Sequence, residues 1–377
     1  MEKRKIVFHL NCLEHGGAER VVSNLANQFG REGYEVIVAT EWKGEEEFPL
    51  IPQVRREIVG LKPGDEKKSR AAKFLLRIRY LRKFLKKERP DMVIAFAHRA
   101  IYRALSSTWG TKIPVIVCCR TDPVGHYDSI SDKIQIKLLF PYAAGAVFQT
   151  YGQRDFFRPY LQDNSCIILN AVNPKYMEVE RPVERRKAVV QSGRLVSMKN
   201  QAMLIDAFVK VHEKHPDYIL QFFGGDSGDG TKEKLMKKIS DYGAQNYIFL
   251  MGDSDQLEKD LADASVYAFS SDWEGLPNAL IEAMTLGLPI VATDCPCGGP
   301  RTIMTNEVDG LLIPIKDQKA LEDGINRLIE DRPFAEKLGR EARKIADKAN
   351  GEAVYEQWRD YIEELCYNHV STEPDKR

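Results

Sequence analysis

Short apolar runs alternate along this chain with segments whose apolar residues recur at helical spacing. The apolar runs cover 6–10, 34–40, 91–97, 114–119, 144–150, 188–192, 218–223, 247–251, 266–270 and 290–292. Helical spacing follows the first run at Val21, Val22, Leu25, Ala26 and Phe29, and it returns over 201–214 and in the tail at Val354, Trp358, Tyr361, Ile362 and Leu365. Apolar runs that alternate with amphipathic helices predict parallel sheets covered by helices, and therefore an α/β fold.

The chain is organised around residues 266–294, where a strand, a loop, a helix and a second strand follow one another. Pro277 suits the first turn of this helix. The loop and the helix N-terminus meet at one edge of a sheet, where free backbone N–H groups and the helix dipole favour an anion. Glu274 and Glu282 flank this anion site. Because a carboxylate repels phosphate, we expect both to accept hydrogen bonds from hydroxyl groups, although an ordinary helix with two surface glutamates gives the same spacing.

Two other predicted strands run into corners of the same kind. The first strand is followed by Gly16 and Gly17, and the strand at 188–192 is followed by Gly193, Arg194 and Lys199. Glycine lets the backbone approach a ligand closely because it has no Cβ. Arg194 offers a planar fork of donors and Lys199 a point charge, which together suit the oxygens of a diphosphate. The simpler alternatives are an ordinary glycine turn and two surface cations.

Length and composition bound the class of protein. A chain of 377 residues with 43% hydrophobic residues suits two ordinary globular domains, and a formal net charge of zero gives no sign of a nucleic-acid partner. No apolar run reaches the length of a membrane span, and the start reads as a strand rather than a signal peptide. The seven scattered cysteines lack zinc-ligand spacing, so we expect reduced thiols in a cytoplasmic protein.

The segment 67–89 is the most charge-biased part of the chain, with eleven lysines and arginines and one acid. Its apolar residues fall on one helical face, at Ala71, Phe74, Leu75, Ile78, Leu81 and Leu85. We expect the basic face to meet anionic lipid head groups, which attract each nearby cation by about 1 kcal/mol. The simpler alternative is a domain helix with a basic outer face.

A polar loop, Arg120-Thr121-Asp122-Pro123-Val124-Gly125-His126, follows the predicted strand at 114–119. Ligands bind outside the carboxyl ends of strands in open α/β sheets. Arg120, Asp122 and His126 are therefore candidate ligand contacts, and a purely structural loop histidine is the alternative.

The string 274–282, E-G-L-P-N-A-L-I-E, resembles the signature of the retaining glycosyltransferases of family 4. The segment G-R-L-x-x-x-K at 193–199 and the G-G-x-E-R segment at 16–20 resemble two further family motifs. The resemblance implies the GT-B fold, in which two Rossmann-like parallel-sheet domains face each other across a cleft and a C-terminal helix crosses back to the first domain. The expected domains are 1–172 on the acceptor side, 173–351 on the nucleotide-sugar donor side, and the helix 352–377, with 173–186 as a linker.

The family's roles, carried to matching positions, make Glu274, His126, Arg194 and Lys199 catalytic. The resemblance implies donor contacts from Gly16, Gly17, Gly193, Arg194, Lys199, Met251, Glu274, Gly275, Leu276, Pro277, Asn278 and Glu282, and acceptor contacts from Arg120, Asp122 and His126. Cations and helix amides would neutralise the leaving diphosphate, so neither a metal nor another cofactor is expected. The chain departs from the family pattern in its lengthened glycine loop at 224–230, and in Arg301-Thr302 where relatives carry an acid.

The R-x-D-P segment at 120–123 resembles enzymes that add N-acetylhexosamines to lipid-linked glycans. The expected function is retaining transfer of an N-acetylhexosamine or hexose from a UDP-sugar to a glycan acceptor on a polyprenyl diphosphate, in cell-surface polysaccharide or glycoprotein glycan synthesis. The expected location is the cytoplasmic face of the membrane, with peripheral attachment through 67–89. A UDP-sugar epimerase of the same fold and a catalytically inactive membrane scaffold are the alternatives.

Overall fold

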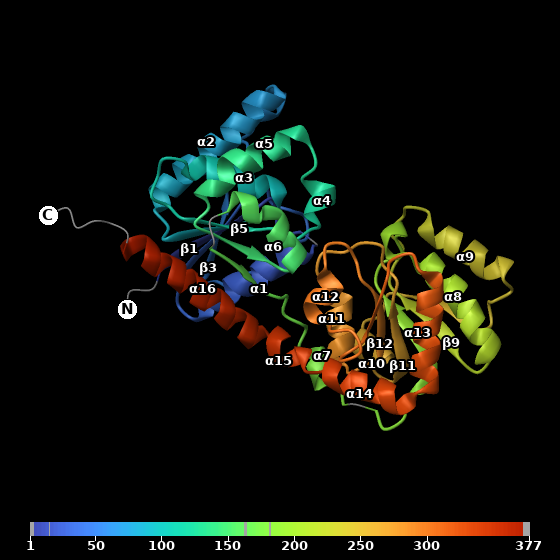
Figure 1. The fold of residues 1–377 in the computed structure, drawn as a ribbon. Coiled ribbons are helices and arrows are strands. Elements are labelled where there is room, and N and C mark those ends of the chain that lie inside the picture. The colour runs from blue at the N-terminus through green and yellow to red at the C-terminus, as the bar shows by residue number, and fades with distance from the viewer. Residues whose placement is uncertain (1–3, 15, 162–163, 181, 372–377) are drawn as a thin grey trace. The chain divides into compact units, whose positions relative to one another are not determined.

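The computed structural model describes residues 4–14, 16–161, 164–180 and 182–371, and the chain divides into two compact units. Unit 1 contains Met1–Ile168 and Tyr355–Arg377, and unit 2 contains Leu169–Val354. Each unit has its own parallel sheet with helices packed against it (Figure 1). Both are α/β units of the kind that the alternating pattern predicts.

Unit 1 is built on a seven-stranded sheet of order β3-β2-β1-β4-β5-β6-β7, with every pairing parallel. Its strands are β1 Lys5–Leu10, β2 Glu35–Thr40, β3 Val54–Ile58, β4 Met92–Phe96, β5 Val115–Cys118, β6 Gly145–Phe148 and β7 Ser165–Ile167. Its helices before the C-terminal one are α1 Gly17–Arg31, α2 Arg70–Glu88, α3 His98–Thr108, α4 Pro123–His126, α5 Ile130–Leu139 and α6 Tyr151–Phe157, and its 3₁₀ turns are η1 Asp65–Lys67, η2 Phe140–Tyr142 and η3 Arg158–Tyr160.

Unit 2 is built on a six-stranded sheet of order β10-β9-β8-β11-β12-β13, again with every pairing parallel. Its strands are β8 Arg186–Ser192, β9 Ile219–Phe223, β10 Ile248–Gly252, β11 Ala264–Phe269, β12 Ile290–Thr293 and β13 Leu311–Ile313. Its helices are α7 Lys175–Glu178, the 3₁₀ turn η4 Ser197–Lys199, α8 Gln201–Lys214, α9 Thr231–Asp241, α10 Leu257–Ala262, α11 Asn278–Thr285, α12 Gly299–Ile303, α13 Gln318–Glu330, α14 Arg332–Ala342 and α15 Ile345–Ala349.

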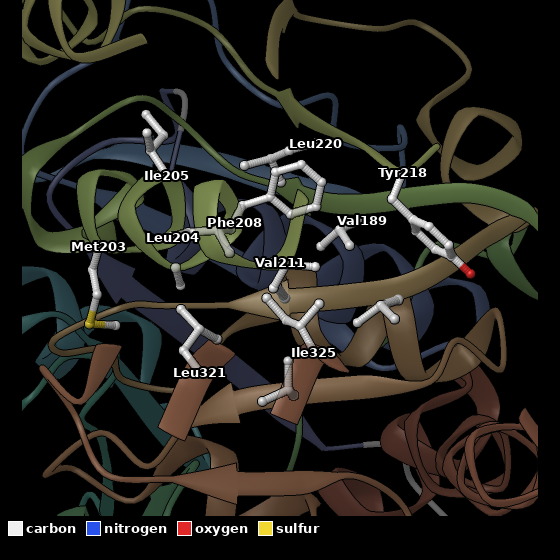
Figure 2. Packing of buried hydrophobic residues seen from close by; sticks show 14 of the residues in the cluster. Val189, Met203, Leu204, Ile205, Phe208, Val211, Tyr218, Leu220, Leu321 and Ile325 are labelled. Atoms are coloured by element: carbon white, nitrogen blue, oxygen red, sulfur yellow. The ribbon is translucent and has the colours of Figure 1, made fainter. Parts of the chain in front are cut away.

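Figure 2 shows how a helix covers the sheet of unit 2. Helix α8 turns Phe208 and Val211 toward the strand residues Val189 and Leu220, and Leu321 from α13 fills the space beside them. All five side chains are fully buried. Burying a side chain of this size contributes about 1.5–3 kcal/mol, so this layer fixes the strands whose ends carry the site.

The C-terminal helix α16 Gly351–Ser371 packs within unit 1 from Tyr355 onward. Trp358 is fully buried and stacks on Phe96 with ring centroids 5.9 Å apart. The hydroxyl of Tyr361 donates to the backbone oxygen of Asn164 at 2.8 Å. The apolar spacing of the tail therefore becomes the face that docks on the first sheet, as the expected crossing helix requires.

One expectation fails in the fold. Residues 173–186 are not a linker, because α7 lies within them and Tyr176 is buried in unit 2. The segment is rich in proline and charged residues, so its composition gives no sign that Tyr176 is buried. Helix α2 buries only part of its apolar face: Leu81 and Leu85 are buried, whereas Phe74 and Leu75 are exposed.

Across the described part of the chain, no helix combines the length and apolar character that crossing a bilayer demands.

Candidate functional site

The main candidate site lies where the strand order of unit 2 reverses. Strands β8 and β11 are neighbours, and the chain leaves them toward opposite sides of the sheet. The loops after their carboxyl ends therefore diverge and leave a crevice, which is where ligands bind in open α/β sheets. We call 193–200 the β8 loop and 270–277 the β11 loop. They contain most of the predicted donor contacts.

The two loops are tied to each other by hydrogen bonds. The amide of Asp272 donates to the Met198 oxygen at 2.9 Å, and the Ser270 hydroxyl donates to the Lys199 oxygen at 2.9 Å. The side-chain amide of Asn200 also donates to Asp272 Oδ1 at 3.0 Å. Two motifs that lie about seventy residues apart in sequence therefore form one rigid element.

Lys199 and Glu274 form an ion pair across this element. Lys199 Nζ contacts Glu274 Oε1, and the two side chains are only 16% and 15% exposed. Nζ also lies 5.7 Å from the centroid of the Phe269 ring. Such a pair is held by the mutual attraction of two charges that have lost most of their water. An incoming anion would compete for the cation.

Gly193 lies beside Lys199 in a backbone conformation that favours glycine. Its φ is +136°, in the region that L side chains rarely adopt, and a Cβ there would lie 3.5 Å from Lys199 Nζ. Gly224 lies against it, since a Cβ on Gly224 would come within 2.2 Å of the Gly193 oxygen. The lengthened glycine loop thus packs against the β8 loop, in which Arg194 is exposed.

Helix α11 begins at Asn278, one residue later than expected, with Pro277 as its N-cap. Asn278 Oδ1 accepts from Asn170 Nδ2 at 2.7 Å, which holds the helix start in place. Glu282 is hydrogen bonded to the buried hydroxyl of Tyr176, and burial together with this carboxylate raises the pKa of Tyr176. Tyr176 is therefore the donor, and it orients Glu282.

The segment 295–301 supports the β11 loop closely. A Cβ on Gly299 would lie 1.9 Å from the Gly275 oxygen and 2.8 Å from Pro277 Cδ. Cys295 Sγ donates to the Ser271 oxygen at 3.3 Å, and burial raises the pKa of this thiol to about 12. The sequence reading missed this support, although the Gly298-Gly299 pair is a visible signal of close backbone approach.

In unit 1 the strand order reverses between β1 and β4. Gly16 is the N-cap of α1 after β1, and a Cβ there would lie 2.1 Å from Glu19 Oε2. Gly17 has open space at its Cβ position. Both glycines thus lie at the reversal point of unit 1, and their donor contacts stay a prediction.

The loop after β5 contains the three predicted acceptor residues. Asp122 caps α4 by accepting from the Val124 amide at 3.1 Å, and the exposed His126 places Nδ1 3.1 Å from the Asp122 oxygen. The guanidinium carbon of Arg120 lies 5.0 Å from the Phe96 ring and 5.8 Å from the Trp358 ring. Arg120 and Asp122 therefore have structural contacts, and His126 is the one whose side chain is exposed.

A histidine that the sequence reading passed over lies nearby in unit 1. His98 follows β4, and its Nε2 lies 2.7 Å from Asp132 Oδ1. Burial acts to raise the pKa of Asp132, but hydrogen bonds from Ser129 and His98 hold it below its usual value. The preceding Ala97 has a φ of +70°, a strained value for a non-glycine residue, which is typical of sharp turns at functional sites. The available signal was a histidine placed directly after a buried strand.

The predicted residues thus fall into two sets. Gly193, Arg194, Lys199, Met251, 274–278 and Glu282 belong to unit 2, whereas Gly16, Gly17, Arg120, Asp122 and His126 belong to unit 1. Met251 lies in β10, next to β9 at the edge of the sheet. Over the residues that the structure places, no cluster of three or more histidines, cysteines and acids is arranged to hold a metal ion.

The sequence matches two family models. Residues 15–175 match "Glycosyltransferase Family 4", and residues 172–345 match "Glycosyl transferases group 1". A Campylobacter jejuni 4-alpha-N-acetylgalactosaminyltransferase, named for its N-acetylgalactosamine-N,N'-diacetylbacillosaminyl-diphospho-undecaprenol substrate, is 26% identical over 87% of this chain and 91% of its own. The amylovoran biosynthesis glycosyltransferase AmsD of Erwinia amylovora is 21% identical over 92% of this chain and 96% of its own.

Solved structures give the same fold. The Anabaena protein HepE in complex with UDP superposes with a TM-score of 0.81 at 17% identity, over 96% of this chain and all of that one. Its complex with UDP-glucose superposes with a TM-score of 0.77. The two-sheet architecture is therefore that of the GT-B proteins.

Proposed function

The chain belongs to the glycosyltransferases, with its first half in family 4 and its second half in group 1, and on this premise we propose that it transfers a sugar from a UDP-sugar with retention at the anomeric carbon. The acceptor in this proposal is a glycan on a polyprenyl diphosphate. The Lys199–Glu274 pair at the strand reversal of unit 2 carries the proposal, because it places a cation and a carboxylate where a nucleotide-sugar would bind. The HepE complexes support UDP, and the undecaprenol-linked substrate named for the Campylobacter relative supports the acceptor.

The leaving diphosphate would bind between the β8 loop and the start of α11. Lys199 and the exposed Arg194 supply positive charge, and the amides of 276–278 at the helix N-terminus supply hydrogen bonds. Negative charge grows on the leaving oxygen as the bond to the anomeric carbon breaks. Fixed donors aimed at that charge lower the barrier without reorganisation. In this proposal the protein's own cations do the work for which other transferases use a metal.

The two acids have different tasks. When the diphosphate takes Lys199, Glu274 loses its partner and can accept hydrogen bonds from hydroxyls of the donor sugar. Glu282, oriented by Tyr176, would accept from the ribose hydroxyls. The main chain around Met251 would hold the base. Donor binding would thus replace the Lys199–Glu274 ion pair by two separate contacts.

We propose that retention arises because the acceptor oxygen attacks the anomeric carbon from the same face that the leaving diphosphate departs from. The bond between the anomeric carbon and the diphosphate oxygen breaks, the acceptor oxygen forms its bond on the same face, and the acceptor proton goes to the departing phosphate oxygen. No covalent intermediate on the protein is needed. His126, exposed in unit 1, would orient the acceptor or the donor sugar.

The location proposed is the cytoplasmic face of the membrane, with peripheral attachment. Helix α2 supports this, because Arg70, Arg79, Lys83, Lys86 and Lys87 are all exposed on it. Cations near an anionic bilayer each gain about 1 kcal/mol, and the acceptor's own phosphates would be attracted to the same surface.

A test of the function is UDP release from a panel of UDP-hexoses and UDP-N-acetylhexosamines, with and without a membrane lipid extract. UDP that appears with one sugar and only with the extract supports transfer and identifies the donor. Consumption of a UDP-sugar without any acceptor would instead favour the epimerase. UDP binding without turnover on the whole panel would favour the inactive scaffold.

A further inference from the structure

Helix α5 is apolar on two faces. Ile136 and Leu139 are buried against the unit, whereas Ile130, Ile134 and Leu138 are 79%, 53% and 56% exposed. The exposed three recur every four residues and therefore share one side of the helix. A helix with one apolar face on the core normally has a polar outer face, so a second apolar row points to a further apolar contact. The outer side of α5 has no covering element among the residues that the structure describes.

The exposed row continues past the end of the helix. Tyr142, four residues after Leu138, is 60% exposed and stacks on Trp109 with ring centroids 5.4 Å apart. Trp109 is itself 53% exposed. We call Trp109, Ile130, Ile134, Leu138 and Tyr142 the apolar edge. Tryptophan and tyrosine at the border of an apolar surface are typical of positions at the level of lipid head groups.

Cations lie along the apolar edge. Lys133 and Lys137 are exposed on α5 between its apolar residues, and Lys112 is exposed near Trp109 in sequence. Helices α2 and α5 both pack against α3, so the strongly basic α2 belongs to the same layer of unit 1 (Figure 1). Phe74 and Leu75, exposed near the start of α2, add to its apolar surface. Apolar side chains interspersed with lysines match a bilayer with anionic lipids better than they match a protein surface.

We propose that the apolar edge inserts into the head-group region of an anionic bilayer, with α5 lying in the plane of the interface. Electrostatic attraction of α2 would bring the unit to the surface, and the apolar edge would then anchor it. The inference rests on the membrane part of the proposed function and not on the transfer chemistry.

Helix α5 also connects this surface to the site of unit 1. Asp132, between Ile130 and Ile134 in sequence, is buried on the inner side of α5 and holds His98 at the carboxyl end of β4. The helix that contacts lipid in the proposal thus also positions a residue at the ligand-binding edge. A lipid-linked acceptor in the same bilayer would present its glycan close to the ligand-binding edge of the sheet in unit 1.

The experiment measures vesicle binding of the full chain by sedimentation, together with quenching of tryptophan by brominated lipids. Vesicles contain phosphatidylglycerol and phosphatidylcholine, or phosphatidylcholine alone. The test variant is the triple I130S/I134S/L138S, whose positions are exposed, so the fold should be retained. The matched control is M236S, because Met236 is an equally exposed apolar residue on α9 of unit 2. W109F identifies the quenched tryptophan among the four in the chain.

Insertion predicts that wild type binds anionic vesicles, keeps part of its binding at high salt, and shows quenching that W109F removes. The triple variant should bind at least about ten-fold more weakly, and M236S should bind like wild type. Equal binding of the triple variant and wild type, or binding that salt abolishes without any quenching of Trp109, overturns the proposal. A wild-type dimer that the triple variant converts to a monomer without lipid would also overturn it, in favour of a self-interface. UDP release with detergent-dispersed acceptor is measured in parallel, since it tests transfer independently of insertion.

Discussion

Replacing Lys199 by alanine is the most informative perturbation of the candidate site. The side chain has two roles that one substitution removes together. It neutralises Glu274, and it is proposed to stabilise the leaving diphosphate when the donor binds. Turnover and stability respond to these roles differently, so the two measurements separate them.

The expected magnitudes follow from burial. Losing one partner of a buried ion pair costs about 3–5 kcal/mol, and side chains that are about one-sixth exposed belong at the lower end of that range. A loss of about 3 kcal/mol lowers the melting temperature of a unit of this size by roughly 6–12 °C. Losing one charge-stabilising donor costs about 2.7–4 kcal/mol in the transition state, or 10²–10³-fold in kcat. We therefore expect kcat to fall about 100-fold, and by at least ten-fold.

The assay is UDP release at saturating donor, below the melting temperature of every variant, together with thermal unfolding. Lys210→Ala is the matched control, because Lys210 pairs with Glu213 on the surface of α8 in the same unit. Exposed pairs of this kind contribute about 0–1 kcal/mol, so neither readout should change much.

The double variant K199A/E274A decides between a structural and a catalytic pair. Removing both charges leaves no uncompensated charge in the site, so stability should recover part of the loss seen in K199A alone. If the pair is only structural, turnover recovers with stability. In our proposal turnover stays low, because both the cation and the sugar contact are absent. Wild-type kcat in K199A or in E274A would refute the reasoning.

Three further predictions follow from single features. Gly299→Ala should displace the β11 loop and thereby weaken UDP binding at least about ten-fold. Gly351→Ala, at a position where a Cβ has open space, should leave UDP binding unchanged. Isothermal titration with UDP measures the affinity of each variant. Removing divalent ions with EDTA should leave UDP release intact, and its abolition would end the metal-independent proposal. Burial lowers the pKa of His9 from 6.5 to about 3, so between these pH values the unfolded chain binds one more proton than the folded chain, and stability falls as the pH falls. H9N should therefore reduce the pH dependence of the unfolding free energy in this range by up to about 1.4 kcal/mol per pH unit. Chemical denaturation at several pH values measures this dependence, and an unchanged slope would contradict the prediction.

The parts of the fold that the sequence predicts well are those with a strong local signal. Helix α8 has the predicted bounds, since its apolar residues keep helical spacing and Asn200 caps its start by accepting from the Met203 amide. The strands buried on both faces also appear as continuous apolar runs. The edge strand β3 was missed because its residues are charged and partly exposed, which gives no apolar run.

The sequence predicts the motifs of the site but not the contacts between them. The spacing of Glu274 and Glu282 identified the β11 loop, but no local pattern relates Lys199 to Glu274 across the intervening chain. That contact depends on β8 and β11 being neighbours, which is a property of the strand order. Likewise, nothing in a proline- and charge-rich segment indicates that Tyr176 orients Glu282.

Strand order also explains why the motifs of both halves have the same form. A glycine in the loop after a buried strand is useful for ligand binding where the next loop turns away and leaves the strand end open. In unit 2 this position is the reversal between β8 and β11, with Gly193 beside Lys199. In unit 1 it is the reversal between β1 and β4, with Gly16 after one strand and His98 after the other. His98 therefore occupies in unit 1 the place that Glu274 occupies in unit 2, at the strand beyond the reversal. Since ligands bind at such positions, His98 is the first residue of unit 1 to test for contact with donor or acceptor. H98A leaves Asp132 in place and should keep the fold, so we expect it to lower kcat without unfolding the protein.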